Sequence, residues 1–405
     1  MTATVLDVYD SDDPQAIIGE AVDRLNAGQI VAFPTETVYG IAANSSDTDA
    51  VAKLFDVKSR STGKPMSLAI GYDYSLDNYA QNPTAIMHRL ARRCWPGPLT
   101  MVIQATEQVA GLSNESRELL APNNWLGLRV PSNEVLLRVL DQLDEPLVLT
   151  SANKSDQADA TTAIEVAEQL DDNVQLILDG GPTKIGTPST VIKVHNDYIE
   201  ILRSGALSRD QIQTALQLEI VIVCTGNTCR SPMAEMLLKN KMATANDIPI
   251  DQLIKHGIHI CSAGIAANNG SPAADQAINV LGKQDLDLTC HSSQPLSYVA
   301  ANSADLILTL SHSHQQAIVN EWPEFADKTS LLAHDGSSVG DPIGGSYKIY
   351  QQCAAQIDTH LDKQRSRINN LIIPDQDIIR EYKRCSLLLV VITGATASNK
   401  RSLIS

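Results

Sequence analysis

Apolar and polar residues alternate along the first half of the chain in a pattern that predicts an α/β domain. Asp13-Pro14 precedes an amphipathic stretch that ends at Gly28, which is typical of a capped helix with proline in its first turn. Beyond it, short apolar runs that predict strands lie between amphipathic stretches that predict helices. Strands are expected at 30–33, 99–103, 126–130, 146–149, 174–178 and 190–194, and helices at 133–143, 161–170 and 208–216.

The second half shows a more regular alternation. Strand-like runs at 218–223, 258–262 and 305–310 are each followed by a helical pattern, and the helices are expected at 233–241, 273–281, 314–319 and 347–361. Strands that alternate with helices favour a doubly wound parallel sheet with helices on both faces. We therefore expect domains over 10–215 and 218–368, then a tail of unknown role over 369–405 in which 386–392 has the composition of one further strand.

Length and composition agree with two globular domains in a reducing compartment. The chain has 405 residues, of which 43% are hydrophobic and 19% charged, and no apolar run approaches the roughly 20 residues needed to cross a bilayer. The N-terminus is acidic where a signal peptide would be basic. Seven cysteines without a secretory context suggest reduced thiols, and no metal-binding spacing stands out. The expected location is the cytoplasm.

Charge argues against nucleic acid as a stable partner of the first domain. The net charge is −16, and residues 1–215 hold 29 acidic against 16 basic residues, so they carry −13 of it. Proteins that bind nucleic acid usually have an excess of Lys and Arg, because phosphate neutralisation supplies most of their affinity. Stable direct binding of tRNA or DNA is therefore not expected.

A cysteine and an arginine with five residues between them form the strongest chemical signal in the chain. Cys224 ends a predicted strand, and Thr225-Gly226-Asn227-Thr228-Cys229-Arg230-Ser231 leads into a predicted helix. A loop of this length can turn its N–H groups toward one anion, and the helix N-terminus adds positive potential. The same field favours the thiolate of Cys224 as a nucleophile, while Arg230 can bind two phosphoryl oxygens. Gly226 and Asn227 suit the positive φ angles expected in such a loop.

An acid for the leaving group is offered by Asp341, in the Asp-Pro-Ile-Gly-Gly loop 117 residues after Cys224. With this loop in place, residues 219–365 resemble the low-molecular-weight protein phosphatases. The resemblance implies that Cys224 is the nucleophile, Arg230 the phosphate clamp and Asp341 the general acid and later base. It also implies a supporting network of Asn227, Ser231, Ser262 and His291, and no cofactor.

Two departures from the tyrosine-directed members bear on substrate choice. Those members commonly have a bulky aliphatic residue where this chain has Thr228, and aromatic residues after the Asp-Pro pair, where this chain has Ile343-Gly344-Gly345. The chain is more similar to the protein-arginine phosphatase branch, which implies phosphoarginine, with phosphotyrosine or a small phosphoester as alternatives. Cys229 could trap an oxidised Cys224 as a disulfide, and it could equally be a small packing residue.

The first half contains a second group of polar motifs at predicted strand ends. Pro34-Thr35-Glu36-Thr37 follows the strand at 30–33, and Lys58 and Arg60 follow a helical stretch in an otherwise acidic domain. Thr150-Ser151-Ala152-Asn153 ends another strand with hydroxyl and amide groups that suit a phosphate or a ribose. An ordinary hydroxyl-rich turn is the alternative interpretation of each motif by itself.

Together these motifs resemble the YrdC-like threonylcarbamoyl-AMP synthases over 10–212. The resemblance also includes Trp95-Pro96-Gly97-Pro98, Pro188-Ser189-Thr190-Val191 and Arg203-Ser204-Gly205. The resemblance implies a twisted, mainly parallel sheet, and a reaction of ATP with Mg²⁺, L-threonine and bicarbonate whose product goes to a tRNA-modifying transferase complex. The implied site residues are Thr35, Lys58, Arg60, Ser151, Asn153, Ser189 and Arg203, with no metal ligand among the side chains. An inactive paralogue or an RNA-binding module is the alternative.

Overall fold

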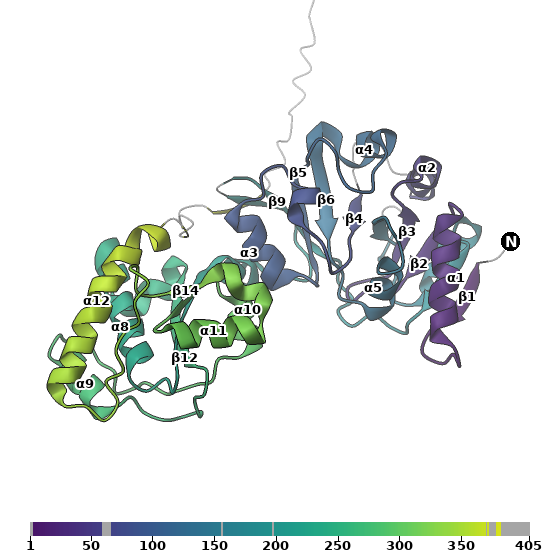
Figure 1. Ribbon diagram of the computed structural model, residues 1–405. Helices are drawn as coiled ribbons and strands as arrows, with labels where there is room; N and C mark the ends of the chain where they lie inside the picture. Colours follow the sequence, from purple (N-terminus) through teal and green to yellow (C-terminus); the bar gives the residue numbers. More distant parts are fainter. Residues whose placement is uncertain are drawn as a thin grey trace, which may run out of the picture.

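The structure, a computed structural model, describes residues 3–58, 66–154, 157–196, 198–369, 371 and 378–381. The described chain forms two α/β domains, each built around its own sheet (Figure 1). Among these residues no helix is long and apolar enough to cross a membrane. The predicted strand at 386–392, like Arg60, lies outside the described residues.

An eleven-stranded sheet forms the centre of the first domain, in the order β1-β8-β2-β3-β7-β4-β6-β5-β9-β10-β15. The strands are β1 (Thr4–Asp7), β2 (Val31–Phe33), β3 (Gly40–Asn44), β4 (Ser67–Ala69), β5 (Leu99–Gln104), β6 (Trp125–Arg129), β7 (Leu147–Ser151), β8 (Leu176–Asp179), β9 (Thr190–Val194), β10 (Ile199–Arg203) and β15 (Ile379–Glu381). The helices are α1 (Pro14–Asn26), α2 (Thr48–Val57), α3 (Ala85–Cys94), α4 (Asn114–Leu120), α5 (Glu134–Leu140), α6 (Ala163–Leu170) and α7 (Arg209–Leu216).

The α/β class is confirmed, but the first sheet is mixed and not mainly parallel. β1–β8, β2–β8, β4–β6, β5–β9 and β10–β15 pair in parallel, whereas the other five neighbouring pairs are antiparallel. Short connections explain part of this pattern, because the turns between β2 and β3 and between β9 and β10 reverse the chain into the adjacent position. The antiparallel pairs of β7 with β3 and β4 instead join segments that are distant in the chain.

Helix α1 illustrates how the sequence sets these elements. Asp13 caps the helix by accepting a hydrogen bond from the Ala16 amide at 3.0 Å, and Pro14 occupies the first turn. The buried residues of α1 lie on one side of the helix: Ile17, Ile18, Ala21 and Leu25. Together with buried residues of α5 they pack against one face of the sheet. The prediction of a capped helix here is confirmed.

The second domain is a four-stranded parallel sheet in the order β12-β11-β13-β14, as predicted for a doubly wound fold. Its elements are β11 (Leu218–Cys224), β12 (Ile258–Gly264), β13 (Leu306–Thr309), β14 (Thr329–Leu331), α8 (Arg230–Asn246), α9 (Asp275–Gly282), α10 (Tyr298–Ser303), α11 (His312–Glu321) and α12 (Tyr347–Asn369). Ile220 and Ile222 of β11 face a core shared with α8, α9 and α12, while Val221 and Val223 face α10 and α11.

A cluster of ion pairs joins the two domains. Arg89, Arg92 and Arg93 of α3 all pair with Asp305, which lies just before β13, and the Asp305 carboxylate also accepts from the Glu219 amide at 3.0 Å. Figure 1 shows α3 beside the second domain at this point. The Asp305 side chain is 6% exposed. The domains are therefore linked by a desolvated charge cluster as well as by the continuous chain.

Replacing Asp305 with alanine should lower the unfolding free energy by about 3–5 kcal/mol, because buried arginines would lose their shared carboxylate. We expect calorimetry of this variant to separate the thermal unfolding of the two domains. Asp358→Ala is the matched control, since its ion pair with Lys241 is more exposed and worth about 1 kcal/mol or less. A single transition with an unchanged midpoint in Asp305→Ala would contradict the assigned role of the cluster.

Candidate active sites

The predicted phosphate loop lies between the end of β11 and the start of α8. Cys224 is the last residue of the central strand, and Arg230 is the first residue of the 17-residue helix, so the helix N-terminus faces the loop. Asn227 adopts a φ of 53°, whereas Gly226 is not among the glycines with positive φ. The expectation of positive φ is confirmed for Asn227 and wrong for Gly226, because one left-handed residue is enough to close this turn.

Asn227 holds the loop together from its centre. Its side-chain nitrogen Nδ2 donates to Ser231 Oγ at 2.9 Å and to Ser262 Oγ at 2.8 Å. Its side-chain oxygen accepts from the backbone amide of Gln294 at 2.9 Å. The backbone oxygen of Asn227 is 2.7 Å from His291 Nε2. The structure thus brings the predicted supporting residues together around one buried side chain.

The Cys224 thiol lies inside this network. Its sulfur is 2.9 Å from Ser231 Oγ and accepts a hydrogen bond from the backbone N–H of Asn227 at 3.3 Å. Burial raises the pKa of Cys261 to about 12 and that of Cys353 to about 12, so these two thiols are neutral near pH 7. Among the cysteines that the structure describes, Cys224 is the one that ends the central strand, accepts a backbone N–H at its sulfur and lies in the loop leading into α8. The geometry supports it as the nucleophile.

Thr228 and Cys229 form the side of the loop nearest α12. Thr228 Oγ1 is 3.7 Å from Cys229 Sγ, and Cys229 Sγ is 3.2 Å from the hydroxyl of Tyr350. Cys229 is 7% exposed. Both interpretations of Cys229 remain predictions, and the contact with Tyr350 adds a hydrogen-bonding partner that the sequence did not indicate.

Arg230 and Asp341 form an ion pair across the mouth of the loop. The arginine side chain is 8% exposed and donates a second bond to the Val339 oxygen at 3.3 Å, while the Asp341 side chain is 45% exposed. Asp341 lies on the connection between β14 and α12, far from the cysteine in sequence. A phosphoryl group would offer Arg230 two oxygens in place of one carboxylate, and it would thereby free Asp341 for proton transfer.

His314 is a residue of this site that sequence analysis missed. It lies on α11, where Nε2 is 2.9 Å from Thr225 Oγ1 and Nδ1 is 2.8 Å from Ser311 Oγ. Burial, followed by the charge of Arg230, lowers the pKa of His314 to about 4. The residue is therefore neutral near pH 7 and contacts the loop without adding charge.

The depressed pKa of His314 makes stability depend on pH with a definite sign. The native state binds fewer protons than the unfolded chain between the pKa of about 4 and the ordinary value of 6.5, so the unfolding free energy should fall as pH falls through this range. One pKa unit corresponds to about 1.36 kcal/mol, so the loss is roughly 3 kcal/mol. In His314→Gln this component should disappear, as urea unfolding at several pH values would show. Equal pH dependence in both proteins would refute it.

In the first domain, Lys58 follows the last residue of α2, and its side chain reaches the end of β7. Its ammonium group donates to the Ser151 oxygen at 2.8 Å, to Asn153 Oδ1 at 2.7 Å and to the Asn153 backbone oxygen. Ser151 Oγ also lies 2.7 Å from Asn153 Oδ1. Lys58 is 4% exposed. Three predicted site residues are therefore in direct contact, although they are about 90 residues apart in sequence.

The other predicted pair, Ser189 and Arg203, meets where β9 and β10 lie side by side. Arg203 donates to the Ser189 backbone oxygen at 2.7 Å and to its hydroxyl at 3.1 Å. Ser189 Oγ is also 2.9 Å from Thr100 Oγ1 on β5. The arginine is thus held at the end of its strand by a neighbouring loop.

The hydroxyl-rich turn at 34–39 lies beside the strand end at Ser151. Thr35 is buried, and its hydroxyl donates to the Val38 oxygen at 2.6 Å, which fixes the turn itself. Glu36 forms a buried ion pair of 2.6 Å with Arg129 at the end of β6. Tyr39 accepts from the Ala152 amide at 2.8 Å, between Ser151 and Asn153. Sequence analysis missed Arg129. The feature that could have indicated it is a single charged residue at the end of a strand-like apolar run.

Comparisons with known proteins agree with this division of the chain. Residues 23–205 match the model of the Sua5/YciO/YrdC family, described as telomere recombination. Threonylcarbamoyl-AMP synthase of Bacillus subtilis is 30% identical over 268 residues, which cover 66% of this chain and 70% of that protein. The chain belongs to the threonylcarbamoyl-AMP synthase family. The synthase of Pyrococcus abyssi is 34% identical over 196 residues, and there the chain spans 56% of the relative's length.

This synthase family member also carries a phosphatase domain. Residues 219–371 match the low molecular weight phosphotyrosine protein phosphatase model. Among solved structures, the YwlE arginine phosphatase of Geobacillus stearothermophilus is similar at 32% identity, with 38% of this chain and 94% of that chain covered and a TM-score of 0.33. The chain is an enzyme that combines a synthase domain for tRNA modification with a low molecular weight protein phosphatase domain.

Proposed function

We propose that the first domain makes threonylcarbamoyl-AMP from ATP, L-threonine and bicarbonate, and that the second removes phosphate from phosphoarginine in proteins. The division into 10–215 and 218–368 stays a prediction, and β15 assigns part of the predicted tail to the first sheet. We place both activities in the cytoplasm, where free thiols such as Cys224 stay reduced. The tRNA-modifying transferase complex is the proposed consumer of the adenylate.

The observation that carries the synthase proposal is the contact of Lys58 with Ser151 and Asn153. Bicarbonate and the threonine amine would form a carbamate with loss of water, and a carbamate oxygen would then attack the α-phosphorus of ATP as pyrophosphate leaves. The leaving group is highly negative, so cations on the protein, together with the Mg²⁺ that accompanies ATP as substrate, would stabilise the transition state. Lys58 and Arg203 are proposed to act on the phosphates.

Arg60 stays a proposed partner of Lys58 at this site. One of the two cations could face the threonine carboxylate and the other the triphosphate. Arg129 is a further proposed contact for the threonine carboxylate, since its guanidinium already binds the carboxylate of Glu36 at the turn.

The synthase proposal is tested by measuring pyrophosphate release from the purified protein. Release should require ATP, threonine and bicarbonate together. Release without threonine would favour another adenylating role, and no release under any condition would favour an inactive paralogue or an RNA-binding module.

The observation that carries the phosphatase proposal is the position of Cys224 within donors fixed by Asn227, beside the pair of Arg230 and Asp341. The thiolate would attack phosphorus, so that an S–P bond forms while the P–N bond to the guanidinium breaks. Asp341 would give its proton to the leaving nitrogen. It would then take a proton from water as water attacks phosphorus, which releases inorganic phosphate and regenerates the thiolate.

Thr228 is expected to decide the substrate class. The wild-type chain should have a higher kcat/KM for phosphoarginine than for phosphotyrosine, because Thr228 and Asp341 offer polar groups to a cationic guanidinium. Thr228→Ile should reverse the preference and shift the ratio by about tenfold or more, since an aliphatic wall suits an aryl ring. Thr228→Ser is the control, because it retains the hydroxyl. Equal or better turnover of phosphotyrosine by the wild-type protein would favour the tyrosine alternative.

A further inference from the structure

We propose that strand β15, which follows the phosphatase domain in sequence, is a positioning element for the ATP side of the synthase site. The proposal rests on the synthase function proposed above. It assigns a role to residues 378–381, which the sequence placed in a tail of unknown role. The claim is that β15 holds both ends of the loop that begins at Arg203, and thereby sets the affinity for ATP.

β15 is docked on the first domain as an integral edge strand. It pairs in parallel with β10, with Ile199 opposite Ile379 and Ile201 opposite Glu381. The Ile199 amide donates to the Ile378 oxygen at 2.7 Å. Ile378 and Ile379 are 5% and 4% exposed and belong to the apolar core of the first domain. The phosphatase domain therefore lies, in sequence, between two parts of the synthase sheet.

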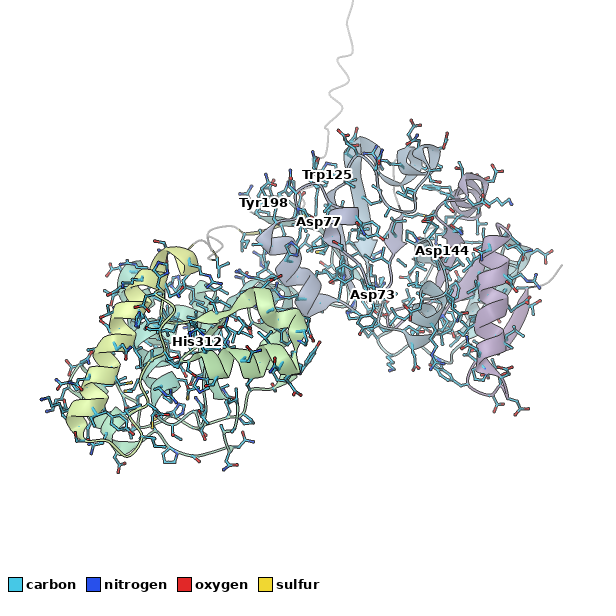
Figure 2. The ribbon with its side chains drawn as sticks, viewed as in Figure 1. Asp73, Asp77, Trp125, Asp144, Tyr198 and His312 are labelled. Carbon is cyan, nitrogen blue, oxygen red and sulfur yellow. The ribbon has the colours of Figure 1, made fainter. Side chains whose placement is uncertain are left out.

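A column of stacked aromatic and cationic side chains supports the same edge. The Arg380 guanidinium lies 3.8 Å from the ring centre of Tyr198, and Tyr198 stacks on His195 at 4.2 Å. The ring centres of His195 and Trp125 are 5.3 Å apart, and Lys193 Nζ lies 3.7 Å from the ring centre of Trp125. Figure 2 shows Trp125 and Tyr198 close together on this part of the domain. Both ring faces of Tyr198 are thus occupied, so the column serves to hold β15.

The mechanical link from β15 to the site runs through two arginines. Arg203 is the last residue of β10, the strand that β15 pairs with, and Arg209 is the first residue of α7. Arg209 donates to the Ile379 oxygen at 2.9 Å. β15 therefore contacts the chain on both sides of the loop 204–208. A shift of β15 would move the strand end that carries Arg203.

The loop has little support from its own interior. It lines a pocket of about 380 Å³ whose walls are formed by Thr190, Ile201, Leu202, Ser204, Gly205, Leu207, Ser208 and Arg209. It is attached to the 188–190 segment, where the Ala206 amide donates to the Pro188 oxygen at 2.9 Å and the Leu207 backbone makes two hydrogen bonds of 2.8 Å with the Thr190 hydroxyl. With a hollow on one side, the position of the loop depends on these attachments to 188–190 and on the contacts of β15 with β10 and Arg209. Well-placed groups at a site lose their effect when displaced by about 1 Å, so β15 should matter for ATP binding.

Two full-length variants test the proposal. Ile379→Asp places a carboxylate at a buried position of β15, and Arg209→Gln removes the cationic donor to the Ile379 oxygen. Both should raise KM for ATP about tenfold, with kcat and KM for threonine changed less than about threefold, because only the phosphate side of the site is displaced. Arg209→Lys should recover much of the wild-type KM for ATP. The phosphatase kcat/KM of the same preparations should be unchanged.

The control is Ile164→Asp, the same change at a residue of α6 that is 69% exposed, and it should leave both activities at the wild-type level. An equal KM for ATP in wild type, Ile379→Asp and Arg209→Gln would overturn the proposal while leaving the synthase function intact. A parallel loss of kcat and phosphatase activity would show general unfolding and would also overturn it. If the wild-type chain itself releases no pyrophosphate with threonine present, the synthase function fails, and the role of β15 fails with it.

Discussion

Replacing Cys224 with serine should lower the phosphatase kcat/KM by about four orders of magnitude or more, since a serine hydroxyl in the same loop is a far weaker nucleophile than a thiolate. The substitution is nearly isosteric, so the contacts with Ser231 Oγ and the Asn227 amide can persist. The loop should still bind phosphate or vanadate, because its N–H groups and Arg230 are untouched. Hydrolysis of phosphoarginine and phosphotyrosine measures the loss, and vanadate binding shows that the site is intact.

Cys290→Ser is the matched control, because Cys290 is exposed and lies outside the loop. It should leave phosphatase activity within about twofold of wild type. Threonine-dependent pyrophosphate release should be unchanged in both variants, because we expect the two active sites to work independently even though the domains are joined at Asp305. Residual phosphatase activity above a few per cent in Cys224→Ser would remove Cys224 from the role of nucleophile.

The phosphate loop could be predicted from sequence because its residues are consecutive, whereas Ser262, His291 and Asp341 are distant in the chain and were assigned through the family resemblance. Cys224 to Ser231 form one continuous loop between a strand and a helix, so their spacing in the chain already fixes their spacing in space. His314 could not be found in the same way. Its contact with Thr225 depends on α11 lying beside the loop, and the local pattern of α11 is that of an ordinary surface helix with a serine cap. Only the packing of the sheet brings it there.

The first domain was harder because its sheet is assembled from distant segments. β3 contains Gly40, Ala42 and Ala43, residues with weak strand preference, and it is a strand because β2 and β7 pair with it on both sides. β15 is separated from β10 by the whole phosphatase domain, so no local pattern could place it. The ion pair of Glu36 and Arg129 is non-local in the same sense. The prediction of the first domain was limited mainly by pairing between segments that are distant in the chain, in addition to the weak apolar pattern of strands such as β3.

The contacts of Lys58 explain why we expect this residue to dominate the synthase site. Its ammonium group is a compact charge with three donors, and it lies among three oxygens contributed by Ser151 and Asn153. The group is thus fixed at the strand end, where the Asn153 amide is itself held by the Ser151 hydroxyl and the Gln157 oxygen. A cation fixed in this way can stabilise charge that develops on the phosphates without reorganising during the reaction.

Lys58→Ala should therefore lower threonine-dependent pyrophosphate release by about two to three orders of magnitude. Lys58→Arg should not restore it, because a planar guanidinium cannot direct its donors to the three oxygens that surround a tetrahedral ammonium. Lys53→Ala, at an exposed position of α2, the helix that ends just before Lys58, is the control and should retain activity. Phosphatase activity measured on each preparation reports whether the protein is folded. Full activity in Lys58→Ala would show that this lysine only fixes the strand end, and the charge on the phosphates would then have to be met by Arg203.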